Sequence, residues 1–326
     1  MSAQHIFTSP AQKEGTGSVS EMLIEQFNGE VQGTLERKSI IRSLVDTPIM
    51  IGTNTFTLKR VGGTVLAGIN PSSEPQATKV QFSNKSVSVD TIVLARNDVY
   101  MLEDIQNDFD AFLPIADEQG KKFAKEFDQS FFIKLRKGAD APAPNLLDWK
   151  SGSKITMTAA NDEDDPDKVV DKLLELVAQM ETKDIDMDDM ILFITPTLKS
   201  VLVKATHLSR LNNGGDSSVQ EYELKDIAGL RVISTNNLPI TVRSQAAGTG
   251  HSLNDINGNT DFDVSAAEAK TLALIGTTKS WLSASSISLT TDIFEDKKSK
   301  SKFIDTYMAW GVEFNRPDNC AVLDSF

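Results

Sequence analysis

The spacing of hydrophobic residues divides the chain into an N-terminal arm, a strand pair, a long helix and a series of helices and strands. Residues 1–20 are rich in Ser, Gly, Gln and Thr and poor in apolar side chains, so we expect them to be mobile in isolation. Over residues 21–44 apolar positions return with partly helical spacing, which Gly29 and Gly33 interrupt. This pattern predicts a short helix within an extended arm, which must lie on another surface of this chain or of another one.

Residues 53–95 show the alternation of apolar and polar positions that is typical of half-buried strands. Two alternating runs are separated by glycines and prolines, which predicts a long two-stranded ribbon with an irregular tip. The apolar parity changes between Phe82 and Val87, and this change predicts a bulge or a twist near Asn84. A lone hairpin is marginal in water, so we expect the ribbon to rest on a neighbouring surface.

A helical region follows the ribbon. Residues 100–108 predict a short helix or turn, and residues 114–137 predict a long amphipathic helix that Pro114 begins and Gly138 ends. A helix of about 23 residues spans roughly 35 Å, which is long for a globular domain.

The second half of the chain alternates between helical and strand patterns. Runs of apolar residues alone predict buried strands, and helices between them predict a central sheet that helices cover, as in an α+β fold. The expected elements are a helix over 167–181, a strand over 190–194, a helix over 195–205, and strands over 229–234, 271–276, 302–314 and 319–324, with loops over 212–216 and 244–263.

Composition narrows the class of protein. The 326 residues include 46 Asp and Glu against 33 Lys and Arg, a net charge of −13, which argues against a nucleic-acid binder. The densest basic cluster, residues 297–302, follows acidic residues and is interpreted as a solvated turn, with a partner-docking patch as the alternative. The sequence shows no membrane span and no secretory signal, so we expect a soluble, cytoplasmic chain.

The sequence contains no motif that marks a catalytic, cofactor-binding or metal-binding residue. No phosphate loop, dinucleotide fingerprint or nucleophile elbow is present, and His5, His207 and His251 lack metal-ligand spacing. The acidic run 161–167 fails the EF-hand pattern and is better explained as the start of a helix, with a structural metal as the less favoured alternative. Cys320 lies in an apolar segment and is expected to act as a small buried hydrophobe. These absences weaken the interpretation as an enzyme without eliminating it, because sites assembled from distant residues leave no local signature.

Four segments, in this order, carry a resemblance to a known family: residues 27–31, 102–110, 229–233 with 237–239, and 310–317. With the arm, ribbon and long helix, they make the chain resemble the major capsid protein of tailed bacteriophages, which has the Hong Kong 97-like fold. The resemblance is closest to the T-odd-type, short-tailed podovirus branch. It implies a structural protein that assembles into pentamers and hexamers of an icosahedral head around double-stranded DNA.

The same resemblance implies a division of the chain. The N-terminal arm would be residues 1–52 and the extended E-loop residues 53–95. The peripheral P-domain, with a spine helix at about 114–137, would combine residues 96–165 and 286–326. The axial A-domain would be residues 166–285.

The resemblance also implies partners and location. These are other copies of the chain, a separate scaffolding protein, a portal protein at one vertex and packaged DNA without sequence-specific contact, with a decoration protein as a further candidate. No membrane is involved, and the protein would belong to the virion capsid after assembly in the bacterial host cytoplasm. The Lys–Asn crosslink of some family members cannot be placed here and is not predicted. Two alternatives are an encapsulin-like nanocompartment shell and a hydrolase that uses scattered carboxylates with a metal.

Overall fold

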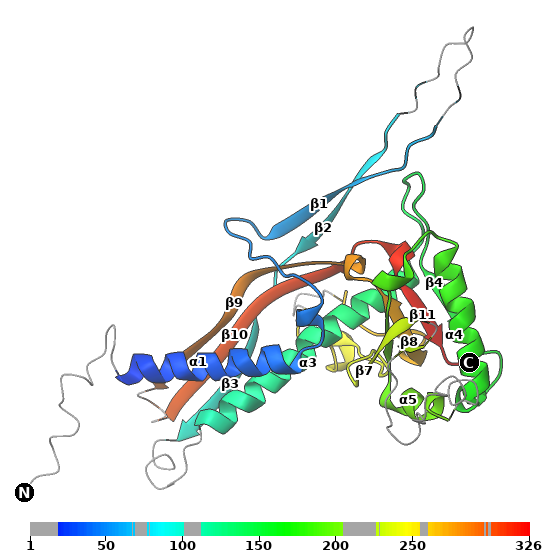
Figure 1. Cartoon of the computed structure of the whole chain (residues 1–326). Coiled ribbons are helices and arrows are strands. Elements are labelled where there is room, and N and C mark those ends of the chain that lie inside the picture. The colour runs from blue at the N-terminus through cyan, green and yellow to red at the C-terminus, as the bar shows by residue number, and fades with distance from the viewer. Residues whose placement is uncertain are drawn as a thin grey trace, which may run out of the picture.

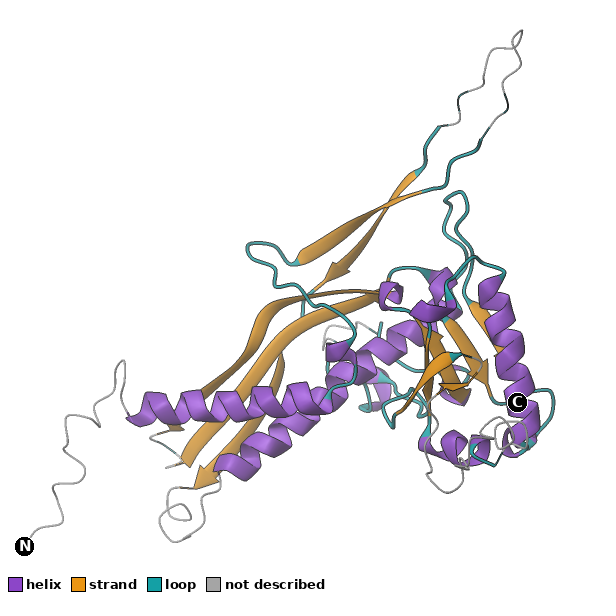
Figure 2. Ribbon diagram, in the orientation of Figure 1, coloured by secondary structure: helices purple, strands orange, loops and turns teal. Residues whose placement is uncertain are grey.

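The computed structural model describes residues 19–66, 68, 77, 79–100, 112–204, 226–227, 229–254, 260–296, 298 and 301–326. The expectations for residues 1–18, 101–111 and 212–216, and for His5 and His207, lie outside this part of the chain. In the described part, one long helix runs from a three-stranded sheet to a six-stranded sheet, and a thin ribbon projects from the body (Figures 1 and 2).

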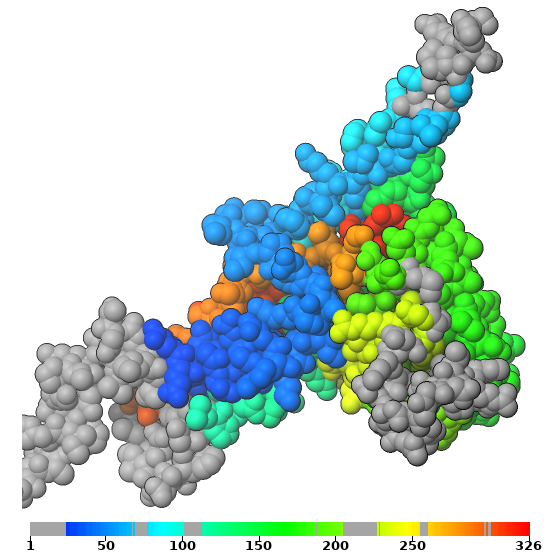
Figure 3. Space-filling view, viewed as in Figure 1, coloured from blue at the N-terminus to red at the C-terminus, as the bar shows by residue number. Residues whose placement is uncertain are grey.

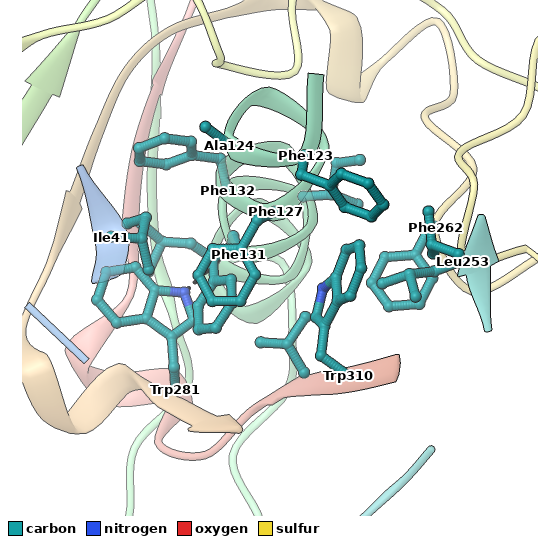
Figure 4. Packing of buried hydrophobic residues seen from close by; sticks show 14 of the residues in the cluster. Ile41, Phe123, Ala124, Phe127, Phe131, Phe132, Leu253, Phe262, Trp281 and Trp310 are labelled. Carbon is teal, nitrogen blue, oxygen red and sulfur yellow. Dashed lines mark hydrogen bonds between the residues drawn. The ribbon is translucent and has the colours of Figure 1, made fainter. Parts of the chain in front are cut away.

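The long helix is α3 (Phe112–Ala139), which confirms the helix expected over residues 114–137. Its apolar stripe is buried along almost the whole length, and Lys121, Lys122 and Lys125 are exposed on the other side of its first half. Residues 127–136 are buried on all sides, so the amphipathic pattern expected for the whole helix holds only for its N-terminal half. Figure 4 shows the centre of this packing, where Phe127 lies 4.8 Å from Phe131 and 5.7 Å from Trp310 between ring centroids. Such aromatic contacts add to area burial and fix α3 against the sheet beneath it.

The arm forms a full helix, α1 (Val19–Lys38), that packs along α3 of the same chain. Phe27, Val31 and Leu35 are buried at helical spacing in the same cluster as the α3 stripe. The prediction that glycines interrupt the arm is wrong. A Cβ atom at Gly29 or Gly33 would have no other atom within 4 Å, so both glycines lie on the open side of a continuous helix.

The three-stranded sheet has the antiparallel order β3-β10-β9, from β3 (Val93–Tyr100), β10 (Ser301–Phe314) and β9 (Trp281–Asp296). Strand β10 was expected, but β9 was not, because many of its residues are Ser and Thr and its apolar alternation is weak. Strand β9 instead forms through its neighbour, because β10 pairs with it along nearly its whole length. The basic cluster 297–302 spans the connection between these two strands.

The six-stranded sheet has the order β4-β11-β8-β5-β7-β6. Alternate residues of its central strands belong to two different cores: Phe193 and Leu274 face the α3 side, whereas Leu192 and Ile275 face α4 and α5. Burial on both faces explains why these strands are apolar throughout. The strands are β4 (Ser153–Thr156), β5 (Ile191–Ile194), β6 (Asp226–Ile227), β7 (Leu230–Ser234), β8 (Thr271–Gly276) and β11 (Ala321–Asp324), of which β4 and β6 were not predicted.

The helices that cover this sheet follow the expected order. Asp165 accepts a hydrogen bond from the backbone N–H of Asp167 and caps α4 (Pro166–Glu181), as the acidic run indicated. Thr195 caps α5 (Pro196–Leu202) in the same way. Short 3₁₀ helices are η3 (Ile41–Ser43), η4 (Asp162–Asp164), η5 (Met187–Asp189), η6 (Gln245–Ala247), η7 (Glu268–Lys270), η8 (Thr278–Ser280) and η9 (Pro317–Asn319).

The ribbon consists of β1 (Thr55–Val61) and β2 (Phe82–Ser88), paired antiparallel without a break. The bulge, one of the two alternatives expected near Asn84, is therefore absent. The parity changes because Val87 faces the body and is buried, whereas Phe82 faces outward and is 72% exposed. The change of apolar parity therefore reflects two different apolar faces of the ribbon and not an irregular backbone.

Candidate assembly surfaces

The inner face of the ribbon is fixed to the body by an apolar cluster. Val87 and Val89 pack with Leu282, Ala284 and Ala309 of the three-stranded sheet. Strand β10 approaches the ribbon so closely that a Cβ atom at Gly311 would lie 2.5 Å from the carbonyl oxygen of Ser88. Only glycine fits at such a distance, so this position defines how the ribbon seats on the sheet.

Arg60 forms the polar part of the ribbon root. Its side chain is buried, and its Nε donates a hydrogen bond to Oδ1 of Asn315 at 3.1 Å. Its guanidinium also donates to the backbone carbonyl of Asn315 and lies 5.3 Å from the ring centroid of Trp149. Burial lowers the pKa of Arg60, and the nearby Glu313 opposes this shift. The arginine therefore joins β1 to the residues that follow β10.

Glu313 links three elements through two lysines. Its carboxylate accepts from Nζ of Lys134 on α3 at 2.9 Å and from Nζ of Lys85 on β2 at 3.2 Å. Burial alone would raise the pKa of Glu313, but the two lysines outweigh it and hold the pKa below the ordinary value. Lys134 is almost completely buried, so this carboxylate is the counter-ion that its charge requires.

The loop before β4 supports the ribbon from the other side. Nε1 of Trp149 donates to the carbonyl of Val61 at 3.2 Å, and the N–H of Gly63 donates to the carbonyl of Leu147 at 2.8 Å. The space-filling view shows the ribbon standing out from the body above this support (Figure 3). The root is thus held by specific polar contacts, whereas the outer face of the ribbon has no cover in the described part of the chain.

The outer face of the ribbon carries an apolar patch, which we call the ribbon patch. Val61 and Phe82 are opposite each other in the register and therefore share one face, and both are exposed. Leu66, just beyond β1, is 93% exposed. Contiguous exposed apolar side chains are typical of protein–protein contacts. The patch consists of Val61, Val65, Leu66, Val80 and Phe82.

The buried carboxylate of Asp128 on α3 fixes the end of the arm. It accepts hydrogen bonds from Oγ of Ser39 at 2.6 Å and from the backbone N–H groups of Ile40 at 3.0 Å and Ile41 at 3.3 Å. Nδ2 of Asn237 donates to it at 3.2 Å. Burial raises the pKa of Asp128, and these hydrogen bonds oppose the shift.

A second buried ion network joins α3 to the six-stranded sheet. Arg136 of α3 donates to Oδ2 of Asp324 on β11 at 2.8 Å and to Oγ1 of Thr271 on β8 at 3.0 Å. Lys154 of β4 pairs with the same carboxylate at 3.0 Å. The network therefore ties three strands to the spine helix.

The histidine and cysteine that the sequence singled out are structural. His251, from the loop after η6, is buried against α3. Its Nε2 lies 3.0 Å from the carbonyl oxygen of Glu126, and its Nδ1 accepts a hydrogen bond from the N–H of Leu253. Burial lowers the pKa of His251 against the opposing effect of Glu126. Burial raises the pKa of Cys320 to about 12, so its thiol is unreactive.

Neither a metal centre nor a membrane span is found in the part of the chain that the structure describes. No group of three or more His, Cys, Asp or Glu side chains there could hold a metal ion, and Asp162 of the acidic run pairs with Lys168 at 2.6 Å. No described helix is both long enough and apolar enough to span a bilayer.

Sequence reasoning missed the residues that build these surfaces. Arg60, Asp128 and Glu313 each interrupt an amphipathic pattern with a charge on its buried side. That interruption was the available signal, but it does not reveal the partner, which lies far away in the sequence.

A chain with a spine helix, two sheets and a projecting ribbon has the architecture of a subunit that is built into a protein shell. A family described as "Phage capsid protein" matches residues 88–318, and the chain belongs to this family. It is thus a structural, non-enzymatic protein of the virion capsid. Comparison with curated proteins gave no match.

Solved structures agree with this assignment at the level of the fold. The capsid of cyanophage P-SCSP1u is 17% identical over 88% of each chain, with a TM-score of 0.76. The mature capsid of bacteriophage PhiM1 is 17% identical over 88% of this chain and 87% of its own, with a TM-score of 0.75. A virus-like particle from Pyrococcus furiosus gives 11% identity over 92% and 99%, with a TM-score of 0.55. The Hong Kong 97-like fold expected from the sequence is confirmed.

Proposed function

We propose that this phage capsid protein forms the pentamers and hexamers of an icosahedral head around double-stranded DNA, in a short-tailed phage of the T-odd-type branch. The observation that carries the proposal is the ribbon, whose root is fixed to the body while its outer face exposes Phe82 and Leu66. In a monomer such a ribbon would be unfavourable, because exposed apolar side chains lower solubility.

Assembly follows from the symmetry of identical subunits. A contact between two different surfaces of the same chain closes into a ring when the rotation between copies closes. Each subunit makes several such contacts, so modest individual affinities add up to a stable shell. The ribbon strands also have free edges that could add backbone hydrogen bonds to a neighbour, and such bonds tolerate the different angles of pentamers and hexamers.

The proposed division of the chain follows the resemblance. Residues 1–52 are assigned to the arm, 53–95 to the E-loop, 96–165 with 286–326 to the P-domain, and 166–285 to the A-domain. The separate sheet of β1 and β2 supports the E-loop assignment, and the β3-β10-β9 sheet beside α3 supports the P-domain. Strands β4 and β11, from the two P-domain segments, complete the six-stranded sheet of the proposed A-domain.

The proposed partners are a separate scaffolding protein, a portal protein at one vertex and packaged DNA, with a decoration protein as a further candidate and assembly in the host cytoplasm. The net charge of −13 supports a wall to which DNA does not adhere. Retardation of duplex DNA by the purified chain in a low-salt gel would contradict this part of the proposal.

Microscopy of the purified chain tests the main proposal. We expect negative-stain images of concentrated material to show rings and closed shells, and analytical ultracentrifugation to show species far larger than a monomer. A chain that stays monomeric at every concentration, also after co-expression with its phage's other head proteins, would overturn the proposal. A co-purified enzyme inside the shells would favour the nanocompartment alternative.

A further inference from the structure

A groove lies between α3 and residues 236–243, the loop that follows β7, and we call it the loop groove. Its volume is about 190 Å³. From the helix, Lys125, Gln129 and Ile133 line it, and these residues share one face because they are spaced four positions apart. The groove therefore lies where the spine helix meets the six-stranded sheet.

The loop is fixed before any partner binds. Nδ2 of Asn237 donates a hydrogen bond to the buried carboxylate of Asp128 at 3.2 Å. NH2 of Arg243 donates to Oε1 of Gln129 at 2.7 Å. The backbone N–H groups of Arg243 and Val264 each donate to the other residue's carbonyl oxygen, at 3.0 Å and 2.9 Å. A site with walls that are already ordered loses little conformational entropy when a ligand binds.

The floor of the loop groove is apolar. Ile133, Leu238 and Val264 line it and are buried in the core around α3. A cavity of about 150 Å³ holds a benzene ring, so the groove has room for one leucine or phenylalanine side chain. On the loop, Ile240 and Val242 are about half exposed and continue the apolar surface outward. An apolar pocket of this size is the kind of site that takes one anchor side chain of a protein partner.

The rim of the loop groove is basic. Lys125 is exposed and has no ion-pair partner among the described residues, and the side chain of Arg243 is 23% exposed. Glu126 lies 3.9 Å from Arg243 and offsets part of its charge, but no carboxylate is among the described residues that line the groove. The chain as a whole carries a net charge of −13, so this is a locally positive site on an acidic protein. Charge complementarity favours an acidic ligand.

The combination of floor and rim favours a peptide over a nucleic acid. Lys and Arg bind the phosphates of a nucleic acid, but a phosphate would leave the apolar floor without a contact. The negative charge of the chain also repels DNA. A peptide segment in which carboxylates flank one apolar side chain matches both parts of the groove.

We propose that the loop groove holds an acidic segment of the separate scaffolding protein, with one leucine or phenylalanine side chain on the floor and carboxylates at Lys125 and Arg243. The inference rests on the proposed function and adds the site at which that partner docks. The site lies beside the end of the arm, because Asp128 accepts hydrogen bonds from both Asn237 and the backbone N–H of Ile40. A bound segment therefore contacts the loop that is tied to the arm.

Binding of the purified chain to the scaffolding protein of the same phage is the first test. Lys125→Glu should weaken binding by roughly tenfold, as expected when an attractive charge at the rim becomes a repulsive one. Added salt should weaken binding of the wild type more than binding of Lys125→Glu. Lys204→Glu, at an exposed position after α5, is the matched control and should bind like the wild type. Melting temperatures check that every variant folds.

Crosslinking is the second test. Thr241 lines the groove and is exposed, so a photo-reactive benzoylphenylalanine in its place should crosslink to the scaffolding protein, whereas the same group in place of Lys204 should not. Mass spectrometry should place the crosslink in a segment where Asp or Glu flanks an apolar residue. Lysine in place of those carboxylates should restore part of the binding of Lys125→Glu.

Several outcomes would overturn the docking site alone. These are shells that form without any scaffolding protein, scaffold binding that Lys125→Glu leaves unchanged, and a crosslink from position 241 to a second copy of the chain. Retention of duplex DNA by the wild type but not by Lys125→Glu would show a phosphate site instead. A wild-type chain that never assembles, even with its scaffolding protein, would overturn the proposed function and the docking site with it.

Discussion

At the scale of single residues, the fold depends on a few buried charges that each serve several elements. Asp128 satisfies the donors at the end of the arm, Glu313 neutralises lysines from the ribbon and the spine helix, and Arg136 joins β8 and β11. Charged groups are costly to bury unless they are paired and hydrogen-bonded. Removal of one partner should therefore lower the free energy of unfolding more than removal of both partners.

The buried carboxylate of Asp128 makes a prediction about pH. Because burial raises its pKa in the folded state, the folded chain binds a proton there more readily than the unfolded chain. Its contribution to stability is full below the unfolded pKa of about 3.9 and is lost as the pH rises through the folded pKa. We expect the advantage of wild type over Asp128→Asn in melting temperature to shrink as the pH rises above the unfolded pKa of about 3.9. An advantage that grows with pH would contradict the assignment.

The ion pair of Glu313 and Lys134 predicts a strong coupling. Glu313→Gln should destabilise the chain by about 3 kcal/mol, because it leaves the buried Lys134 without a counter-ion. The double variant Lys134→Met/Glu313→Gln should be less destabilised than the sum of the two single variants. Denaturant unfolding measures all four chains. A Glu313→Gln variant within about 0.5 kcal/mol of wild type would show that solvent, not Glu313, compensates the lysine charge.

At the scale of elements, periodicity predicted what local sequence can encode. The spine helix, α4, α5 and the strands β5, β7, β8, β10 and β11 follow from apolar spacing because each buries a regular face. Strand β9 was missed because pairing with β10 and packing of its alternate residues, not its own composition, make it a strand. The length of α1 was underestimated because packing of Phe27, Val31 and Leu35 on α3 overrides the low helix propensity of two glycines.

The contact between α1 and α3 depends on one glycine. A Cβ atom at Gly120 would lie 2.8 Å from Cβ of Thr34 and 2.9 Å from the carbonyl oxygen of Val31, so the two helices could not stay at their distance. Gly120→Ala should therefore destabilise the chain by about 1–3 kcal/mol, whereas alanine elsewhere in a helix stabilises it.

The matched controls for Gly120→Ala are Gly29→Ala and Gly33→Ala. Both positions face open space within α1, so each substitution should stabilise the chain by roughly 0.5–1 kcal/mol. Thermal unfolding of the three variants gives the comparison. Equal effects at all three positions would mean that α1 does not pack on α3 in solution.

At the scale of the whole molecule, the structure consists of a body and the projecting ribbon. The body has two cores on opposite faces of the six-stranded sheet, and α3 runs along one of them. In the part of the ribbon that the structure describes, the contacts with this body lie at the root, and the strands project away from it (Figure 1). The sequence predicted that such a limb needs a partner, but alternation along one strand cannot say which face meets its own body and which meets another copy.

This separation predicts that stability and assembly can be disrupted independently. Trp149 lies under Arg60 and Arg316, with its ring centroid 5.3 Å and 4.6 Å from the two guanidinium groups, and it belongs to none of the apolar cores of the described residues. Trp149→Ala should loosen the ribbon root and speed tryptic cleavage at Lys59 and Lys79 by roughly tenfold, while the melting temperature of the body stays nearly unchanged. Shell assembly should fail, because a ribbon without a fixed direction pays an entropic cost each time it docks.

The contrasting variant is Trp281→Ala. Trp281 is buried in the core against Phe131 and Phe193, and its Nε1 donates to the carbonyl of Phe131 at 2.9 Å. Its removal should cost about 3–5 kcal/mol of global stability. If both variants lowered the melting temperature and assembly to the same extent, the ribbon would be part of one cooperative unit with the body. If only Trp149→Ala left the body intact while abolishing shells, the direction of the ribbon would be an assembly determinant in its own right.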